Sequence, residues 1–157
     1  MELREFEQEA TEQDERGEEI EGEVQLHKER LALLETAASQ LKAALQEVGS
    51  EESVEAIQSA EQAQVETERR MEELEREREE MLEENAEMQE RVTQGLEKRQ
   101  NAKETIDLLR DMDAQTEDNA TNEVSQMKEA LENDIRYLEL VQEAIYSARK
   151  RLDAIEI

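Results

Sequence analysis

The sequence predicts an all-α protein, a long antiparallel coiled coil of about three helices: a helical hairpin plus a third helix. Charged residues make up 41% of the 157 positions and aromatic residues 2%, a composition typical of long helices and coiled coils. Proline is absent and only four glycines occur, so residues that end helices are rare. Apolar residues recur at spacings of three and four, which favours helical seams over a disordered acidic chain.

The first helix is expected over residues 2–48, because one line of positions there keeps this spacing without a slip. Eleven of its fourteen positions are apolar, the exceptions being Gln13, Gly17 and His27. The helix should end at Gly49, because glycine suits the left-handed conformation that follows many helices, and Ser50 can cap the next helix. The line runs through Leu3, Phe6, Ala10, Gln13, Gly17, Ile20, Val24, His27, Leu31, Leu34, Ala38, Leu41, Leu45 and Val48.

The second helix is expected over about 51–112, with a poorer seam that four residues interrupt. Asn85 can fix the register of the helices or be a tolerated polar position, and Gly95 can mark a bend or only a weak point. The apolar members are Val54, Ile57, Ala60, Ala63, Met71, Leu74, Met81, Met88, Val92, Ile106 and Leu109; the interruptions are Arg78, Asn85, Gly95 and Arg99.

A loop is expected within 113–122, which lacks large apolar residues and is rich in turn and capping types, and a continuous helix is the alternative. A third helix follows over about 122–157, where Asp134 is the one polar residue in the seam and the neighbouring Ile135 can help to complete it. One line of its seam is Val124, Leu131, Leu138, Ile145 and Leu152, and the other is Met127, Asp134, Val141, Ala148 and Ile155. Across the chain, the residues expected to carry helix packing are Leu31, Leu34, Leu41, Leu45, Leu131, Leu138, Ile145 and Leu152.

Two reversals of direction predict a single elongated unit spanning residues 1–157. The first helix would lie along the first half of the second, and the third helix along its other half, leaving a triple-stranded middle and two-stranded arms. The basic triplet Arg149, Lys150 and Arg151 would then come level with Glu83 and Glu84. We expect a charge-complementary contact there.

The formal charge of −26 disfavours binding to nucleic acid or to anionic membranes, because both are negatively charged. No run of apolar residues reaches membrane-spanning length, and no apolar segment near Met1 resembles a signal peptide. The expected location is therefore the cytoplasm, or the exterior by a route without a classical signal peptide.

No catalytic, cofactor or metal site is expected, and the chain is predicted not to be an enzyme. The chain has no cysteine, and His27 is its one histidine. The position three before His27 is Val24, so the Glu-x-x-His pattern of two-iron bundles is missing. Residues 111–122 begin like a calcium loop, but Thr116 stands where glycine is needed and Asn122 where a glutamate is needed. His27 itself is interpreted as a polar residue tolerated in the seam. The alternative interpretation is that it makes the helix packing sensitive to pH at this point.

Three functions fit these expectations. The first is a scaffold or adaptor that binds another protein or a second copy of itself through helix contacts. The second is a secretion-associated or exported hairpin, since the first hundred residues are loosely similar to the small hairpin proteins of type VII secretion. This chain lacks that family's turn tryptophan, and Lys150 and Val141 stand where its Tyr-x-x-x-Asp/Glu signal would need an acid after Tyr146 and Tyr137. The third is an acidic chaperone or inhibitor that masks a basic or apolar client.

Overall fold

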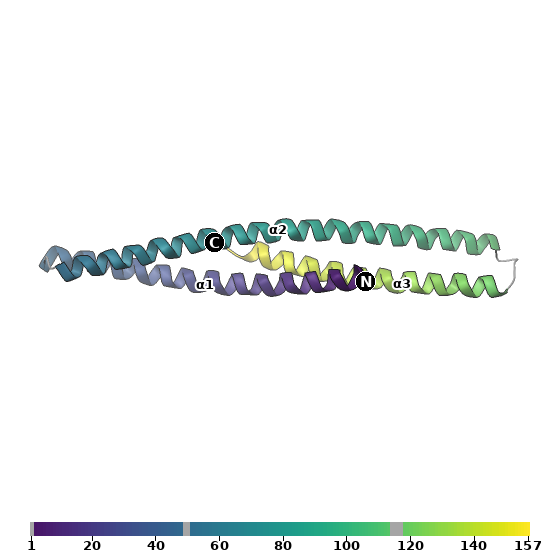
Figure 1. Cartoon of the computed structure of the whole chain (residues 1–157), viewed down its shortest axis with the longest axis horizontal. Helices are drawn as coiled ribbons and strands as arrows, with labels where there is room; N and C mark the ends of the chain where they lie inside the picture. The colour runs from purple at the N-terminus through teal and green to yellow at the C-terminus, as the bar shows by residue number, and fades with distance from the viewer. Residues whose placement is uncertain (1, 49–50, 114–117) are drawn as a thin grey trace. The chain divides into compact units, whose positions relative to one another are not determined.

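The computed structural model describes residues 2–48, 51–113 and 118–157, and these ranges form an all-α fold of three helices without strands. The helices are α1 (Glu2–Val48), α2 (Glu51–Asp113) and α3 (Asp118–Ala154) (Figure 1). The predicted all-α class with three helices is therefore confirmed.

The helix ends follow local sequence signals. Acidic Glu51 and Glu52 occupy the first turn of α2, where they complement the positive end of the helix dipole. The helix α3 begins at Asp118, about four residues before the predicted start, because Asp and Asn are favoured at helix N-termini. The predicted turn at Gly49 and Ser50, and the part of the predicted loop at 114–117, lie outside the described residues.

Gly95 lies inside the uninterrupted helix α2. A Cβ atom placed there would lie 3.6 Å from Leu138 Cδ1 and 3.5 Å from the Arg99 guanidinium, which are ordinary contact distances. Neither a bend nor a close approach of helices therefore requires glycine at this position. Of the two interpretations of Gly95, the structure favours the weak point, at a cost of about 0.5–1 kcal/mol relative to alanine.

The chain divides into two compact units. Unit 1 contains Met1–Glu15 and Leu82–Arg151, and unit 2 contains Arg16–Met81 and Leu152–Ile157. Both α1 and α2 contribute residues to each unit. The expectation of a single elongated unit stays a prediction.

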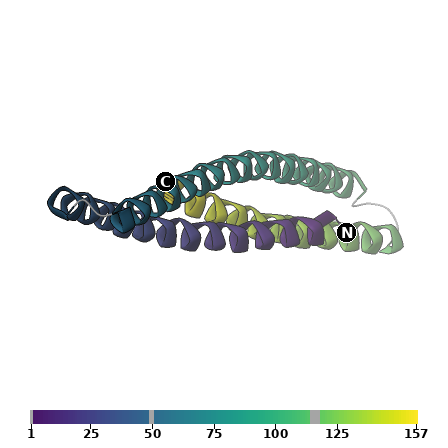
Figure 2. The same cartoon turned by 60° about the vertical axis from the view of Figure 1, so that its left-hand side comes forward.

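Unit 1 is a three-helix bundle, in which α1 and α3 run in the same direction and α2 runs opposite to both (Figures 1 and 2). The side-chain pairs that establish these directions are Glu2 with Arg99 and Glu9 with Arg91 across α1 and α2, and Glu7 with Tyr137 and Asp14 with Arg151 across α1 and α3. In unit 1, α2 is therefore antiparallel to both of its neighbours, while α1 and α3 contact each other as parallel helices.

The core of unit 1 draws apolar residues from all three helices. In α3, Ile135 is buried beside the half-buried Asp134, so the apolar residue occupies the seam where the heptad pattern places the acid. Burial of one such side chain is worth about 1.5–3 kcal/mol. The cluster consists of Phe6, Ala10, Met88, Val92, Leu96, Ile135, Leu138, Val141 and Ile145.

Unit 2 pairs the rest of α1 with the first half of α2 in antiparallel fashion, as the ion pairs Glu23 with Arg70 and Lys42 with Glu61 show. The end of the chain joins this unit, where Leu152 and Ile155 are buried. Its other buried apolar residues are Ile20, Val24, Ala38, Ile57, Met71, Leu74 and Met81. Helix packing over an apolar seam is thus common to both units.

Replacing the fully buried Leu138 with Asp should remove the cooperative melting of α3, because a carboxylate would enter the core of unit 1. A loss of about 3–5 kcal/mol in the free energy of unfolding is expected from a lost core side chain and a buried polar group. Thermal melting followed by circular dichroism measures it. The matched control is Leu140→Asp, which adds the same charge to an exposed position of α3 and should change stability by less than about 0.5 kcal/mol. Equal effects of the two substitutions would refute the seam assignment.

Candidate protein-interaction surfaces

The predicted packing residues differ in burial according to how many helices surround them. Leu138 and Ile145 in unit 1 and Leu152 in unit 2 are fully buried. The other five are only half-buried, because they lie where two helices pair without a third to cover the seam. These are Leu31, Leu34, Leu41, Leu45 and Leu131.

Polar residues of α2 contact other helices at regular intervals. Arg78, Asn85 and Arg99 follow a spacing of seven or fourteen residues, so they face the same side of the helix as the seam. In unit 2, Arg78 Nε donates a 2.6 Å hydrogen bond to the carbonyl oxygen of Leu152. That carbonyl belongs to the last turn of α3, where no complete set of helical partners exists. Three of the four interruptions of the predicted seam, Arg78, Asn85 and Arg99, therefore make polar contacts with other helices.

Asn85 joins all three helices of unit 1. Its side chain is fully buried, and Nδ2 donates to Gln13 Oε1 of α1 at 2.6 Å and to the Ile145 carbonyl of α3 at 3.0 Å. Gln89 Nε2, one turn further along α2, donates to Asn85 Oδ1 at 3.1 Å. A one-residue slip of α1 or α3 would break a buried hydrogen bond. Register control is the interpretation of Asn85 that this geometry favours.

Arg99 lies where the three-helix part of unit 1 ends. Its guanidinium is 3.9 Å from Glu2 at the start of α1 and 3.4 Å from Asp134 of α3. Beyond it, α2 and α3 continue as a pair joined by Lys103 with Glu132 at 3.4 Å, and by Lys128 with Asp107 at 2.7 Å. The hydrogen bond from Lys128 lowers the pKa of the Asp107 carboxyl.

This two-stranded end of unit 1 exposes large apolar side chains. Leu108, Leu109 and Met112 of α2 and Met127 of α3 are between 50% and 79% exposed. The seam pattern places Leu109 and Met127 in the core, but both are exposed, because among the described residues only α2 and α3 pair at this end of unit 1. Leu108 stood outside the predicted seam, and its spacing of four from Met112 was the signal that could have identified this face.

A second polar cluster lies in unit 2 around Arg70. Its Nε and Nη2 donate to both carboxylate oxygens of Glu23 at 2.6 and 2.8 Å, while Nη1 donates to Glu73 and Glu77 at 3.2 and 3.1 Å. The hydrogen bonds that Arg70 donates lower the pKa of the Glu23 carboxyl below its ordinary value of 4.5, and the same bonds raise the pKa of Arg70. A bidentate ion pair of this kind holds α1 and α2 in one register.

His27 lies next to this cluster. Its Nε2 is 3.5 Å from Glu23 Oε1, and its Nδ1 is buried without a hydrogen-bond partner. The ring is half-buried on the seam side of α1. The position agrees with the interpretation of His27 as a polar seam residue, and its role as a pH-sensitive point stays a prediction.

The basic triplet has partners on both neighbouring helices of unit 1. Arg149 Nη1 donates to Gln89 Oε1 at 3.3 Å, the Lys150 ammonium lies 5.1 Å from the centre of the Tyr146 ring, and Arg151 Nε is 3.0 Å from Asp14 Oδ1. Glu83 and Glu84 are exposed on α2. The contact expected between these glutamates and the triplet stays a prediction.

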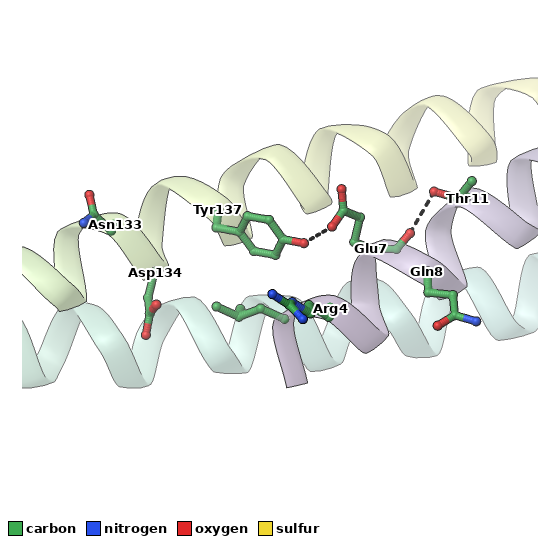
Figure 3. Close-up of a pocket in the computed structure, with 8 residues that line it drawn as sticks. Arg4, Glu7, Gln8, Thr11, Asn133, Asp134 and Tyr137 are labelled. Carbon is green, nitrogen blue, oxygen red and sulfur yellow. Dashed lines mark hydrogen bonds between the residues drawn. The ribbon is translucent and has the colours of Figure 1, made fainter. Parts of the chain in front are cut away.

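A shallow cleft of about 820 Å³ lies between the start of α1 and α3 in unit 1 (Figure 3). The Tyr137 hydroxyl donates to the Glu7 carboxylate across it, which raises the pKa of the phenol. Arg4 lines the same cleft, and Thr11 Oγ1 donates to the Glu7 carbonyl at 2.9 Å. The hydrogen bond from Tyr137 to Glu7 thus joins α1 and α3 across the cleft.

Within the described ranges, no three acidic or histidine side chains gather as metal ligands would. The same residues include no helix that is apolar over the length needed to cross a membrane. The chain matches no protein family model, no curated protein and no solved structure.

Replacing Asn85 with Leu should lower the free energy of unfolding by about 1–3 kcal/mol, because the buried Gln13 amide loses its partner. Adding Gln13→Leu should restore most of that stability, since two apolar side chains can pack where two amides stood. Denaturant unfolding of the two single variants and the double variant gives the coupling energy. Additive losses, with no recovery in the double variant, would show that the two amides do not act together.

Stability should also depend on the charge of Glu23. Because folding lowers its pKa, the stabilising pair with Arg70 is fully present above pH 4.5 and is lost as the pH falls through the lowered value. Wild type should therefore exceed Glu23→Gln by about 0.5–1 kcal/mol at neutral pH, a figure reduced for exposure to solvent, and the difference should vanish in acid. Melting curves in a His27→Gln background exclude a contribution from the imidazole. A difference that persists unchanged below the lowered pKa would contradict the pairing.

Proposed function

We propose that the protein is a non-enzymatic interaction module, a scaffold or adaptor that binds an amphipathic helix of another protein. The observation that carries the proposal is the uncovered face of α2 and α3 beyond Arg99 in unit 1. We call this face the open groove and define it by Leu108, Leu109, Met112 and Met127, all of which are exposed. Exposed apolar patches on a highly charged surface are typical of interaction sites.

The position of α1 in the same unit shows how a helix fits against this pair. Phe6 and Ala10, four residues apart, enter the core, while Glu7 and Glu9 on the flanks bind Tyr137 and Arg91. The Arg91 guanidinium also lies 4.9 Å from the centre of the Phe6 ring. A partner helix in line with α1 would place apolar residues at the same three and four spacing in the open groove.

The acidic charge around the open groove favours basic residues on the flanks of the partner helix. Residues 100–113 and 118–132 contain eight acidic and three basic positions, and the whole chain carries −26. Lysine or arginine beside the apolar stripe would therefore speed association and disfavour acidic competitors. We infer that the partner presents a basic amphipathic helix.

A phage-displayed library of helical peptides with apolar residues at three and four spacing tests the proposal. Enriched peptides should carry lysine or arginine on their flanks and bind the wild-type chain, measured by calorimetry. The double substitution Leu109→Glu and Met112→Glu should weaken binding at least tenfold, which corresponds to about 1.4 kcal/mol. Leu140→Glu, an equally exposed leucine of α3, is the matched control.

Two results would overturn the proposal. Scrambled peptides of the same composition that bind as well as the selected ones would mean that charge alone drives binding. A chain that is dimeric in solution and becomes monomeric with Leu109→Glu and Met112→Glu would assign the open groove to a second copy instead. Absence of any enriched peptide also counts against it.

A further inference from the structure

In unit 2, α1 carries a second apolar stripe outside the seam that faces α2. Leu26 and Leu33 are 63% and 73% exposed, although both lie in the longest leucine- and alanine-rich stretch of the chain. At 100° per residue, positions 26, 33, 37 and 44 fall within about 40° of one another, and the seam lies about 100° away. The self-pairing stripe, as we name it, consists of Leu26, Leu33, Ala37 and Ala44, and the exposed polar residues Arg30 and Gln40 lie between them on the same side of α1.

Alanines of α2 extend this surface. Glu23 of α1 reaches Arg70 of α2, so these two residues lie on the flank where the helices meet. Residues seven apart on a coiled-coil helix face the same way, which places Ala37 and Ala44 on the flank of Glu23, and Ala63 and Ala56 on that of Arg70. Small side chains on both helices leave room for a third helix to approach closely.

The stripe is self-complementary in shape. Its spacings of seven, four and seven residues are symmetric about position 35, whereas its side chains run from two leucines to two alanines. In an antiparallel pair of α1 helices with a twofold axis at position 35, Leu33 faces Ala37 of the second copy and Leu26 faces Ala44 of the second copy. Each leucine then packs against an alanine of the second copy. The twofold axis repeats each of these pairs, so the two surfaces are complementary, as an isologous interface requires.

The charge of this stretch permits two copies to meet. Residues 26–44 contain three basic positions, Lys28, Arg30 and Lys42, and two acidic ones, Glu29 and Glu35. The rest of the chain carries the acidic excess that makes up the net charge of −26. The acid–acid repulsion that opposes self-association elsewhere is therefore absent between these two stretches.

We propose that two copies of this chain associate through the self-pairing stripe, antiparallel and with residues whose numbers add to seventy facing each other. The occupant of this surface is a second copy of the same chain. This interface lies in unit 2 and is independent of the open groove proposed to bind a partner helix.

Size-exclusion chromatography with light scattering on the full chain tests the association. The expected mass is twice the 18.3 kDa of one chain, falling to the mass of one chain at low loading. Leu33→Glu should weaken the association at least tenfold and give a monomer, while the control Leu140→Glu should leave the dimer intact. A monomer at every loading of the wild type overturns the proposal, as does a dimer that Leu33→Glu leaves unchanged.

A swap of side-chain size tests the register itself. Ala37→Leu alone should weaken the dimer, because two leucines then meet across the interface. Adding Leu33→Ala should restore it, because the large and small residues are merely exchanged between facing positions. Failure of the double variant to recover would refute this register. Neither substitution touches the open groove, so peptide binding there should stay unchanged, and the two proposals fail separately.

Discussion

The structure depends on one constraint: the apolar seam through which each helix packs is narrow, and no helix can bury its seam alone. With charged residues at 41% of the chain and few aromatics, no helix has enough apolar surface to form a compact core. Long helices of this kind gain their stability mainly from tertiary packing. The number of neighbouring helices therefore decides how well each seam residue is buried, as fully buried Leu138 and half-buried Leu131 show within unit 1.

Polar contacts then select one arrangement among many that would bury the same stripes. Apolar seams with alanine and leucine tolerate shifts by a heptad, because leucine packs against leucine in either register. Asn85 and Arg70 do not tolerate them, since each binds specific atoms on another helix. In both units the polar residues contribute specificity that the apolar residues lack.

Heptad spacing was sufficient to predict three helices, because no proline and few glycines interrupt the pattern. The spacing could not show how many helices surround a given residue, which is why Leu109 and Met127 are exposed at seam positions. It also could not distinguish a useful polar residue from a defect. Asn85 was one of four interruptions in the pattern, and its importance depends on Gln13, seventy-two positions earlier in the chain, and on a backbone carbonyl of α3.

Native-state hydrogen exchange along α2 of unit 1 tests most directly whether a third helix sets local stability. The sequence of α2 is helical and highly charged on both sides of Arg99, so intrinsic propensity alone would give similar protection throughout. We expect much stronger protection of the backbone amides in 82–99, which both α1 and α3 flank, than in 100–113, which α3 alone flanks. Equal protection in the two stretches would contradict it.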